Sequence, residues 1–291
     1  MLHRFVLHNG CISEASAHTL SAGQVGLLSG WGVFSTLRVV EGVPFAFERH
    51  WARISRDAAA LHVPLPADAE AVRRGLIELI DANGASQCTM RLVIVRNGGG
   101  MWEGPGQSQP SDVIALTADS KQWGASVKLA YVPHARHAAN PFAGAKMLSW
   151  AMNLTWLESA QKQGFDEAVL LNERGEVAEC TSANIFIANG NDVWTPPLSA
   201  GCLPGITREV LLEEVRVPGV RIGEKMLMPA DLEKADEVFI TSTTRSLLPV
   251  VQLEHRKLGT AAAMVRPALE TAFAGFVERY VAAHKETPAA R

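Results

Sequence analysis

The stretch from Lys146 to Arg208 constrains the fold of this 291-residue chain more than any other. Short apolar runs in it are separated by turn residues of the kind that joins adjacent strands, Asn172 to Gly175 and Asn189 to Asp192. These runs predict two hairpins, Ala168–Leu171 with Glu176–Cys180 and Asn184–Ala188 with Val193–Thr195. A helix is expected to follow from Thr207, after the turn that Pro204 and Gly205 indicate.

Alternating and helical apolar patterns also occur on both sides of this stretch. Strands are expected at 5–7, 33–40, 43–47, 88–96, 112–117, 127–132 and 237–241. Helices are expected from Glu48 to about 63, from about Ala67 to Asn83, from Lys146 to Gly164, and around Phe273. In the third of these, Met147, Trp150, Leu154 and Leu157 share a face. The composition turns polar at 118–124, which predicts a smaller N-terminal α/β domain at 1–118 and a larger cofactor-binding domain at 119–291.

Composition excludes several classes of protein. The chain is 47% hydrophobic and 20% charged with a net charge of −3, which is typical of a soluble globular protein and not basic enough to indicate nucleic acid. We expect no membrane span, no signal peptide and a cytoplasmic location. The four cysteines form no C-x-x-C pair and are expected to be buried thiols. His134 and His137 lack a supporting ligand cluster, so no metal site is predicted.

Three features of the central stretch carry chemistry together. Lys146 offers an amine nucleophile, Glu179 a carboxylate at a strand end, and the segment from Pro204 to Arg208 the start of a helix. An amine, an acid that keeps a ring nitrogen protonated and a helix N-terminus that holds a phosphate are the groups that pyridoxal 5′-phosphate needs. Each is common alone, and Lys146 by itself is typical of a surface lysine.

The order of these residues resembles the fold-type IV, or class IV, pyridoxal-phosphate enzymes. That family includes the branched-chain and D-amino-acid aminotransferases and 4-amino-4-deoxychorismate lyase. The matching motifs are Lys146, Glu179 with Asn184-Ile185-Phe186, L-x-G-I-T-R from Leu203 to Arg208, H-x-x-R from His50 to Arg53, and G-x-G-x-F-x-T-x-R-V from Gly30 to Val39. The resemblance implies a two-domain α/β (α+β) fold, the cofactor in the inter-domain cleft, and a homodimer.

The resemblance also implies a role for each matching residue. Lys146 would form a Schiff base with the cofactor aldehyde and then move the substrate proton, and Glu179 would face the pyridine nitrogen. The residues implied to hold the phosphate are Arg53, Ile206, Thr207, Ser242 and Thr243. Those implied for the substrate pocket are Phe34, Thr36, Arg38, Arg91 and Trp150.

Departures from the family pattern bear on the substrate. Trp150 stands near the place where branched-chain enzymes have a tyrosine. Met101 and Glu103 count against a D-amino-acid aminotransferase and weaken the lyase alternative, whereas Arg91 and the Thr-Pro-Pro run at 195–197 favour the branched-chain group. We therefore predict an aminotransferase acting on a small or branched amino acid and a 2-oxo acid. The alternatives are an aminodeoxychorismate lyase, favoured by 32–39, and a non-catalytic relative that binds the cofactor or nothing.

Overall fold

The computed structural model of the chain describes residues 1–17, 23–99, 109–258 and 264–285. The chain divides into two compact units. Unit 1 consists of Met1–Lys121, Ala145–Trp150 and Val277–Arg291, and unit 2 of Gln122–Gly144 and Ala151–Phe276. The domain boundary at 118/119 that the sequence suggests stays a prediction.

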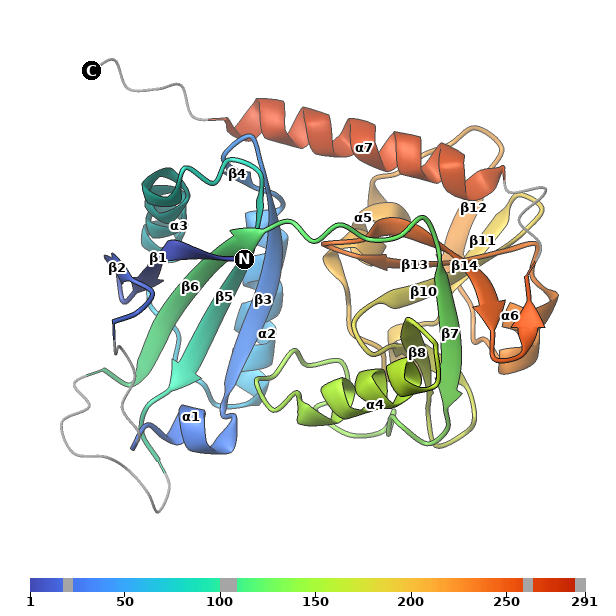
Figure 1. Ribbon diagram of the computed structural model, residues 1–291, viewed down its shortest axis with the longest axis horizontal. Coiled ribbons are helices and arrows are strands. Elements are labelled where there is room, and N and C mark those ends of the chain that lie inside the picture. The colour runs from blue at the N-terminus through green and yellow to red at the C-terminus, as the bar shows by residue number, and fades with distance from the viewer. Residues whose placement is uncertain (18–22, 100–108, 259–263, 286–291) are drawn as a thin grey trace. The chain divides into compact units, whose positions relative to one another are not determined.

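Unit 1 is built on a six-stranded antiparallel sheet with strand order β2-β1-β6-β5-β3-β4 (Figure 1). Its strands are β1 (Leu2–His8), β2 (Cys11–Glu14), β3 (Gly32–Val40), β4 (Val43–Pro44), β5 (Cys88–Arg96) and β6 (Ser111–Asp119). Its helices are α1 (Val25–Ser29), α2 (Phe47–Ala60) and α3 (Ala69–Asn83). Apolar residues of α2 and α3, among them Ile54 and Leu76, share one core with Val33 and Leu37 of β3. Because side chains alternate along a strand, Phe34, Thr36 and Arg38 lie on the opposite face of the sheet.

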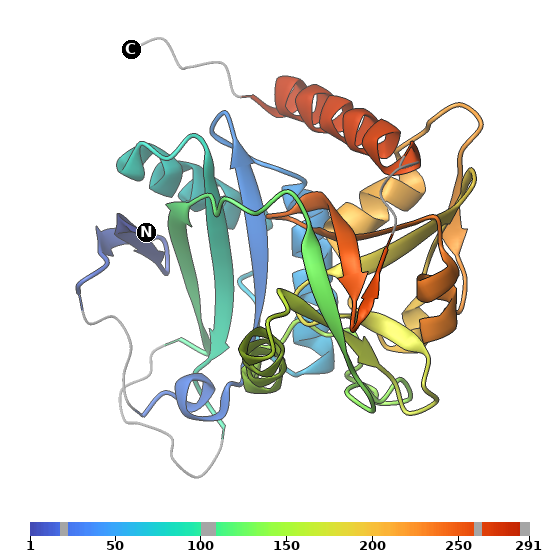
Figure 2. The same ribbon diagram turned by 45° about the vertical axis from the view of Figure 1, so that its right-hand side comes forward.

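Unit 2 is built on a nine-stranded mixed sheet with order β12-β11-β10-β13-β14-β7-β8-β9 and β15 beside β14 (Figure 2). Its strands are β7 (Val127–Val132), β8 (Glu167–Leu171), β9 (Val177–Cys180), β10 (Asn184–Asn189), β11 (Asp192–Thr195), β12 (Arg221–Glu224), β13 (Glu237–Ser242), β14 (Ser246–Leu253) and β15 (Arg256–Lys257). Its helices are α4 (Ala151–Lys162), the 3₁₀ turn η1 (Leu198–Ala200), α5 (Ile206–Glu213) and α6 (Pro229–Lys234), and α7 (Val265–His284) begins in it. The strands β8 and β13 are buried almost throughout, as expected of strands inside a sheet, and β9, the last strand of the order, is buried as well.

Most of the elements expected from the sequence are present, including both hairpins. The helix expected from Lys146 is wrong: α4 begins only at Ala151, and residues 146–148 are extended against β3. Leu154, one of the residues expected to share a face of that helix, is 53% exposed. The backbone of 146–148 finds partners in β3 instead of in a helical turn, which a helical apolar spacing cannot reveal.

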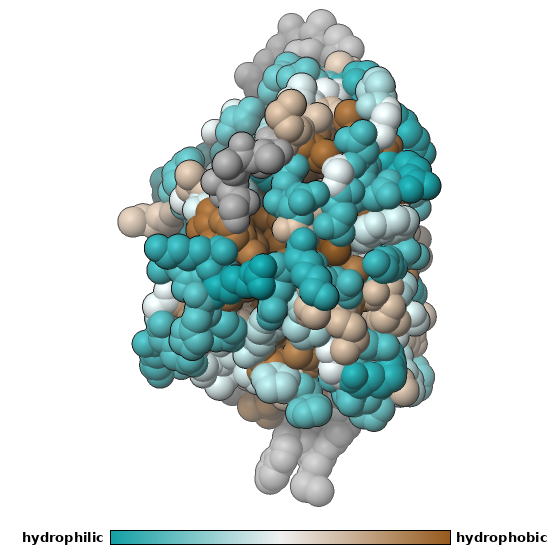
Figure 3. Space-filling view, turned by 90° about the vertical axis from the view of Figure 1, so that its right-hand side faces the viewer, coloured by the Kyte–Doolittle hydropathy of each residue, from teal (hydrophilic) through white to brown (hydrophobic). Residues whose placement is uncertain are grey.

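The surface of the molecule is polar where Figure 3 displays it. Hydrophilic side chains predominate on that face, and apolar side chains show between them. Within the described ranges, no helix is long and apolar enough to cross a membrane.

Candidate functional site

The backbone of Lys146 is fixed inside unit 1 by contacts to β3 and α2. Phe34 N donates to Lys146 O at 3.0 Å and Leu148 N to Gly32 O at 2.9 Å, so this segment extends the sheet beyond β3. The carboxylate of Asp57, on α2 and 2% exposed, accepts a hydrogen bond from Lys146 N at 2.9 Å. The position of the lysine is therefore set by three separate backbone contacts.

The amine of Lys146 lies between aromatic rings. Its Nζ is 4.5 Å from the centroid of Phe34 and 5.6 Å from that of Trp150. These two rings meet edge to face with centroids 5.9 Å apart. The guanidinium of Arg91 stands 4.5 Å from the Phe34 centroid, so two cations share this ring. The surroundings are apolar and cationic, which suits an amine that must react with an anionic ligand.

A hydrogen-bonded chain on the other face of β3 holds Arg53. Arg53 Nη2 donates to Ser35 Oγ at 2.6 Å, and Ser35 Oγ is 2.7 Å from His50 Nδ1. Because a guanidinium only donates, the serine hydroxyl accepts from Arg53, and the same oxygen is hydrogen-bonded to the ring nitrogen of His50. Burial, followed by the charges of Arg53 and Lys146, holds the pKa of His50 well below its ordinary value. This low pKa favours the neutral imidazole of His50.

In unit 2, the carboxylate of Glu179 is held from both sides. Its Oε1 accepts from Arg136 Nε at 2.9 Å and its Oε2 from Leu203 N at 3.0 Å. Glu179 is 7% exposed, and Arg136 in turn donates from Nη2 to Asn153 Oδ1 at 3.3 Å. Arg136 is not among the residues that the sequence motifs indicate. A lone arginine 43 residues before the glutamate gives no signal of this contact.

The start of α5 is shaped by Asn184. Asn184 Nδ2 donates to Leu203 O at 2.8 Å, so Asn184 and Glu179 take the carbonyl and the amide of the same residue. A Cβ added at Gly205 would lie 2.1 Å from Asn184 Oδ1, which leaves room only for glycine. The glutamate, the asparagine and the L-x-G segment thus form one physical unit, although 24 residues separate Glu179 from Leu203.

The N-terminus of α5 and the end of β13 offer donors to an anion. Gly205 is the N-cap of α5 and makes no side-chain capping bond, while Ile206 and Thr207 are only 3% and 4% exposed. Buried amides at a helix start need a partner, and the helix dipole favours an anion there. Thr241 pairs with Asn184 in the register of β13 and β10, which places the following Ser242 and Thr243 at the same end of the sheet.

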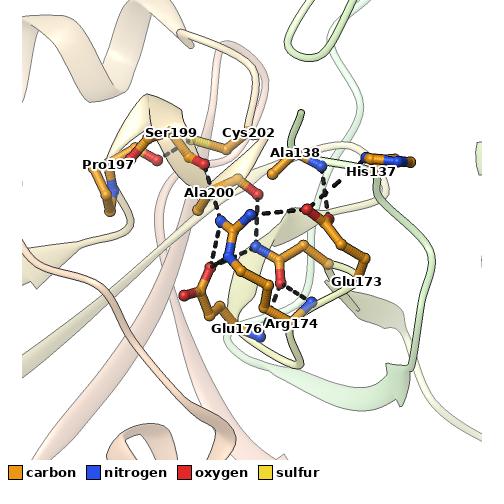
Figure 4. A network of polar contacts seen from close by, with 10 residues as sticks. His137, Ala138, Glu173, Arg174, Glu176, Pro197, Ser199, Ala200 and Cys202 are labelled. Carbon is orange, nitrogen blue, oxygen red and sulfur yellow. Dashed lines mark hydrogen bonds and ion pairs between the residues drawn. The ribbon is translucent and has the colours of Figure 1, made fainter. Parts of the chain in front are cut away.

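Polar side chains at the turn between β8 and β9 bind the two loops whose residues contact Glu179 (Figure 4). Glu173 accepts from Ala138 N at 2.8 Å, in the loop that carries Arg136. Arg174 donates from Nη2 to Ser199 O at 3.2 Å, in the loop that leads to Leu203. Both contacts to Glu179 are therefore supported from one turn.

The residues present fit pyridoxal 5′-phosphate. Unit 1 carries a lysine among aromatic rings and an arginine oriented through Ser35, and unit 2 carries a buried carboxylate beside a buried, uncapped helix N-terminus. A buried acid suits a ring nitrogen, and uncapped amides suit a phosphate. Within the described part of the chain, no group of three or more His, Cys, Asp and Glu side chains could hold a metal ion.

The predicted site residues fall into two groups. Lys146, Phe34, Trp150 and Arg91 come together in unit 1, and Thr36 and Arg38 share the sheet face of Phe34. Those of unit 2 are Glu179, Ile206, Thr207, Ser242 and Thr243. Met101 and Glu103, which bear on the substrate, lie outside the described residues, as does most of the glycine-rich segment at 97–106.

Comparison with known proteins agrees with this fold and these motifs. The architecture matches the branched-chain aminotransferase of Thermoproteus uzoniensis solved with norvaline, with a TM-score of 0.86, 24% identity, and 96% of this chain and 98% of that chain covered. D-alanine aminotransferase of Bacillus licheniformis is 28% identical over 88% of this chain and 91% of its own length. A Methanocaldococcus jannaschii protein, provisionally named as a branched-chain-amino-acid aminotransferase, is 30% identical over 85% of this chain and 87% of its own length.

The chain is therefore a pyridoxal-phosphate enzyme with the fold-type IV architecture. Residues 32–253 match the family described as amino-transferase class IV, and the chain belongs to that family. It is an aminotransferase that uses pyridoxal 5′-phosphate.

Proposed function

We propose that this chain transfers an amino group between a small or branched-chain amino acid and a 2-oxo acid, with pyridoxal 5′-phosphate bound as a Schiff base to Lys146. The family match carries this proposal, because it spans both Lys146 and Glu179 within residues 32–253. The branched-chain preference is supported by the 30% identity to the Methanocaldococcus protein and by Arg91 beside the lysine.

Lys146 is the catalytic residue of the proposal. When bound, the cofactor supplies an electron sink for the carbon that carries the amino group. The Lys146 amine would take the proton from that carbon as a general base and pass it to C4′ of the cofactor as a general acid. Three backbone contacts fix the lysine in unit 1, so only the side chain must move during this transfer.

Glu179 faces the ring nitrogen in the proposal, and Arg136 orients it. The Leu203 amide and the Arg136 Nε fix the two carboxylate oxygens at 3.0 and 2.9 Å, which leaves the plane of the carboxylate defined before any ligand arrives. A charged acid so fixed needs little reorganisation to stabilise a protonated ring.

The phosphate is bound in the proposal by Arg53, the amides of Ile206 and Thr207, and the hydroxyls of Ser242 and Thr243. Arginine contributes a planar fork of donors, which the bond to Ser35 Oγ orients in advance. The uncapped start of α5 supplies amides and dipole for a dianion.

The substrate is bound in the proposal against Phe34, Thr36, Arg38, Arg91 and Trp150. The Phe34 and Trp150 rings offer apolar area to a branched side chain. Arg91, held over the Phe34 ring, offers a forked donor to a substrate carboxylate.

A panel of amino donors tests this function. Purified protein saturated with pyridoxal phosphate is given L-leucine, L-valine, D-alanine or aminodeoxychorismate, with 2-oxoglutarate as acceptor. We expect glutamate formation to be at least tenfold faster with the branched L-amino acids than with D-alanine. Faster transfer from D-alanine would replace the substrate assignment by the activity named for the Bacillus relative. Pyruvate release from aminodeoxychorismate without an acceptor would establish the lyase instead.

The assembly and location are also proposals. By resemblance to the family, we propose a homodimer in the cytoplasm. Sedimentation equilibrium of the holoprotein tests the dimer, and a monomer mass at micromolar concentration would contradict it.

A further inference from the structure

One buried ion pair in unit 2 has no part in the chemistry described so far. Glu167 begins β8, and Arg245 lies in the turn between β13 and β14. Their side chains are 1% and 5% exposed, and Arg245 Nη2 donates to Glu167 Oε2 at 3.1 Å. The Arg245 guanidinium also stands 3.9 Å from the Trp123 ring centroid. Burying two charges is costly unless every bond is made, so this pair needs a reason.

The carboxylate of Glu167 gathers donors from three segments. Its Oε1 accepts from Ala168 N at 3.0 Å, from Thr181 N at 3.2 Å and from Thr181 Oγ1. Its Oε2 accepts from Ser182 Oγ at 2.6 Å as well as from Arg245. Thr181 and Ser182 follow directly on the strand that carries Glu179. The carboxylate thereby fixes the end of that strand.

Arg245 fixes the turn that precedes it. Its Nη1 donates to Ser182 O at 3.1 Å and to Ser242 Oγ at 3.4 Å, and its backbone N donates to Ser242 O at 3.2 Å. Ser242 and Thr243 are two of the residues to which the proposed function gives the phosphate. The same guanidinium therefore contacts the strand end near Glu179 and the turn of the phosphate donors.

We propose that Glu167 and Arg245 are positioning residues, which set the Ser242–Thr243 turn for the cofactor phosphate relative to the Glu179 strand. This inference rests on the proposed function, because it takes Ser242 and Thr243 as phosphate donors. Neither residue of the pair touches the reacting atoms. Their effect passes through Ser182 and Ser242, the residues that Arg245 binds.

The test compares binding of pyridoxal 5′-phosphate with binding of pyridoxal, which lacks the phosphate. The ratio of the two dissociation constants, measured on apoprotein by absorbance titration, is the phosphate preference. In Glu167→Gln, an amide NH₂ replaces one of the two carboxylate oxygens, so the donors that bind that oxygen lose their acceptor. We expect the phosphate preference to fall at least tenfold, while the dissociation constant for pyridoxal changes less than threefold.

Two further variants separate positioning from stability. In Glu167→Met combined with Arg245→Met, the charges are removed together, which restores much of the stability lost in a single variant. We expect this double variant to unfold near the wild-type urea midpoint and still to show the reduced phosphate preference. Arg245→Lys keeps the cation but not the forked bonds, and we expect it to lower the preference as well.

Glu237→Gln is the matched control. Glu237 is a buried carboxylate at the opposite end of β13 from Ser242, about 17 Å away at 3.4 Å per residue. It accepts from Val265 N at 2.8 Å and from Arg266 N at 3.1 Å at the start of α7. We expect this variant to lower the urea midpoint and to leave the phosphate preference within twofold of wild type.

The outcomes separate the two proposals. If all Glu167 and Arg245 variants keep the phosphate preference of the wild type within twofold, the positioning role is overturned. The proposed function is unaffected by that result. A wild-type protein that binds pyridoxal as tightly as its phosphate ester contradicts the phosphate site itself, and the positioning role falls with it.

Discussion

Replacing Gly205 by alanine tests how the E-x-x-x-x-N and L-x-G-I-T-R motifs are joined. The backbone at Gly205 has φ −72° and ψ 140°, which any residue adopts, so glycine is not required by conformation. The restriction is steric, because an added Cβ would lie 2.1 Å from Asn184 Oδ1. The Asn184 side chain must therefore move in Gly205→Ala.

The expected magnitude follows from the bond that this movement breaks. Asn184 is 5% exposed, and its Nδ2 donates to Leu203 O at 2.8 Å. A buried polar group left without its partner costs about 1–3 kcal/mol. Replacing an N-cap glycine by alanine adds a smaller cost, since alanine is the poorer cap. We expect the free energy of unfolding of the apoprotein to fall by about 2–3 kcal/mol. Binding of pyridoxal phosphate is expected to weaken as well, since Leu203 also donates to Glu179.

Urea unfolding followed by circular dichroism measures this loss. In the Asn184→Ala background the clash is absent, so Gly205→Ala should cost at least about 1.5 kcal/mol less there than in the wild type, as a double-mutant cycle. Gly124→Ala is the control, because its added Cβ would lie an ordinary 3.6 Å from Ser126 O. A cost below about 0.5 kcal/mol for Gly205→Ala, or strict additivity with Asn184→Ala, would refute the reasoning.

Three further predictions concern single side chains. Glu179→Gln keeps the cofactor bound but lowers kcat on the order of a thousandfold, measured by steady-state transamination, and near-normal turnover would contradict the ring-nitrogen assignment. Because the pKa of buried His50 is held well below its ordinary value, the unfolded chain binds a proton near pH 6.5 that the folded chain does not. The free energy of unfolding therefore falls below that pH by up to about 1.4 kcal/mol per pH unit. Urea unfolding at pH 7.5 and pH 5.5 measures this fall, which should be smaller in His50→Asn than in the wild type. An equal fall in both proteins would exclude His50 as the source. Arg91→Leu raises KM for a dicarboxylic 2-oxo acid about tenfold to a hundredfold, because one charge-assisted hydrogen bond is lost, and leaves kcat within threefold of wild type. Steady-state kinetics measure both constants, and an unchanged KM would show that Arg91 does not bind the substrate.

The elements with local signals were predictable from the sequence. The strand expected at 127–132 is β7, and the helix expected to end at Asn83 and Gly84 is α3, whose C-cap Gly84 has φ +60°. Both follow from alternation, helical spacing and a glycine that accepts the left-handed conformation. The class of enzyme was also predictable, because its motifs are short segments that keep their order.

Contacts between distant segments were not predictable. Lys146 was expected on a helix because the following apolar residues have helical spacing, but its backbone bonds to β3, more than a hundred residues earlier. The pairing of Arg136 with Glu179 depends on how two loops fold back onto β9, and no local pattern encodes it. Ser35 reads as part of an alternating strand, and only the position of α2 gives it to His50 and Arg53.

The covalent bond to Lys146 is the central claim, and peptide mass spectrometry after borohydride reduction tests it most directly. The holoprotein is reduced, digested and searched for the phosphopyridoxyl group, with Lys128→Arg and Lys146→Arg as a matched pair of variants. The account predicts the group on the peptide that contains Lys146, in wild type and in Lys128→Arg, and its absence from Lys146→Arg. A reduced adduct on another lysine, or full labelling of Lys146→Arg, would contradict the account.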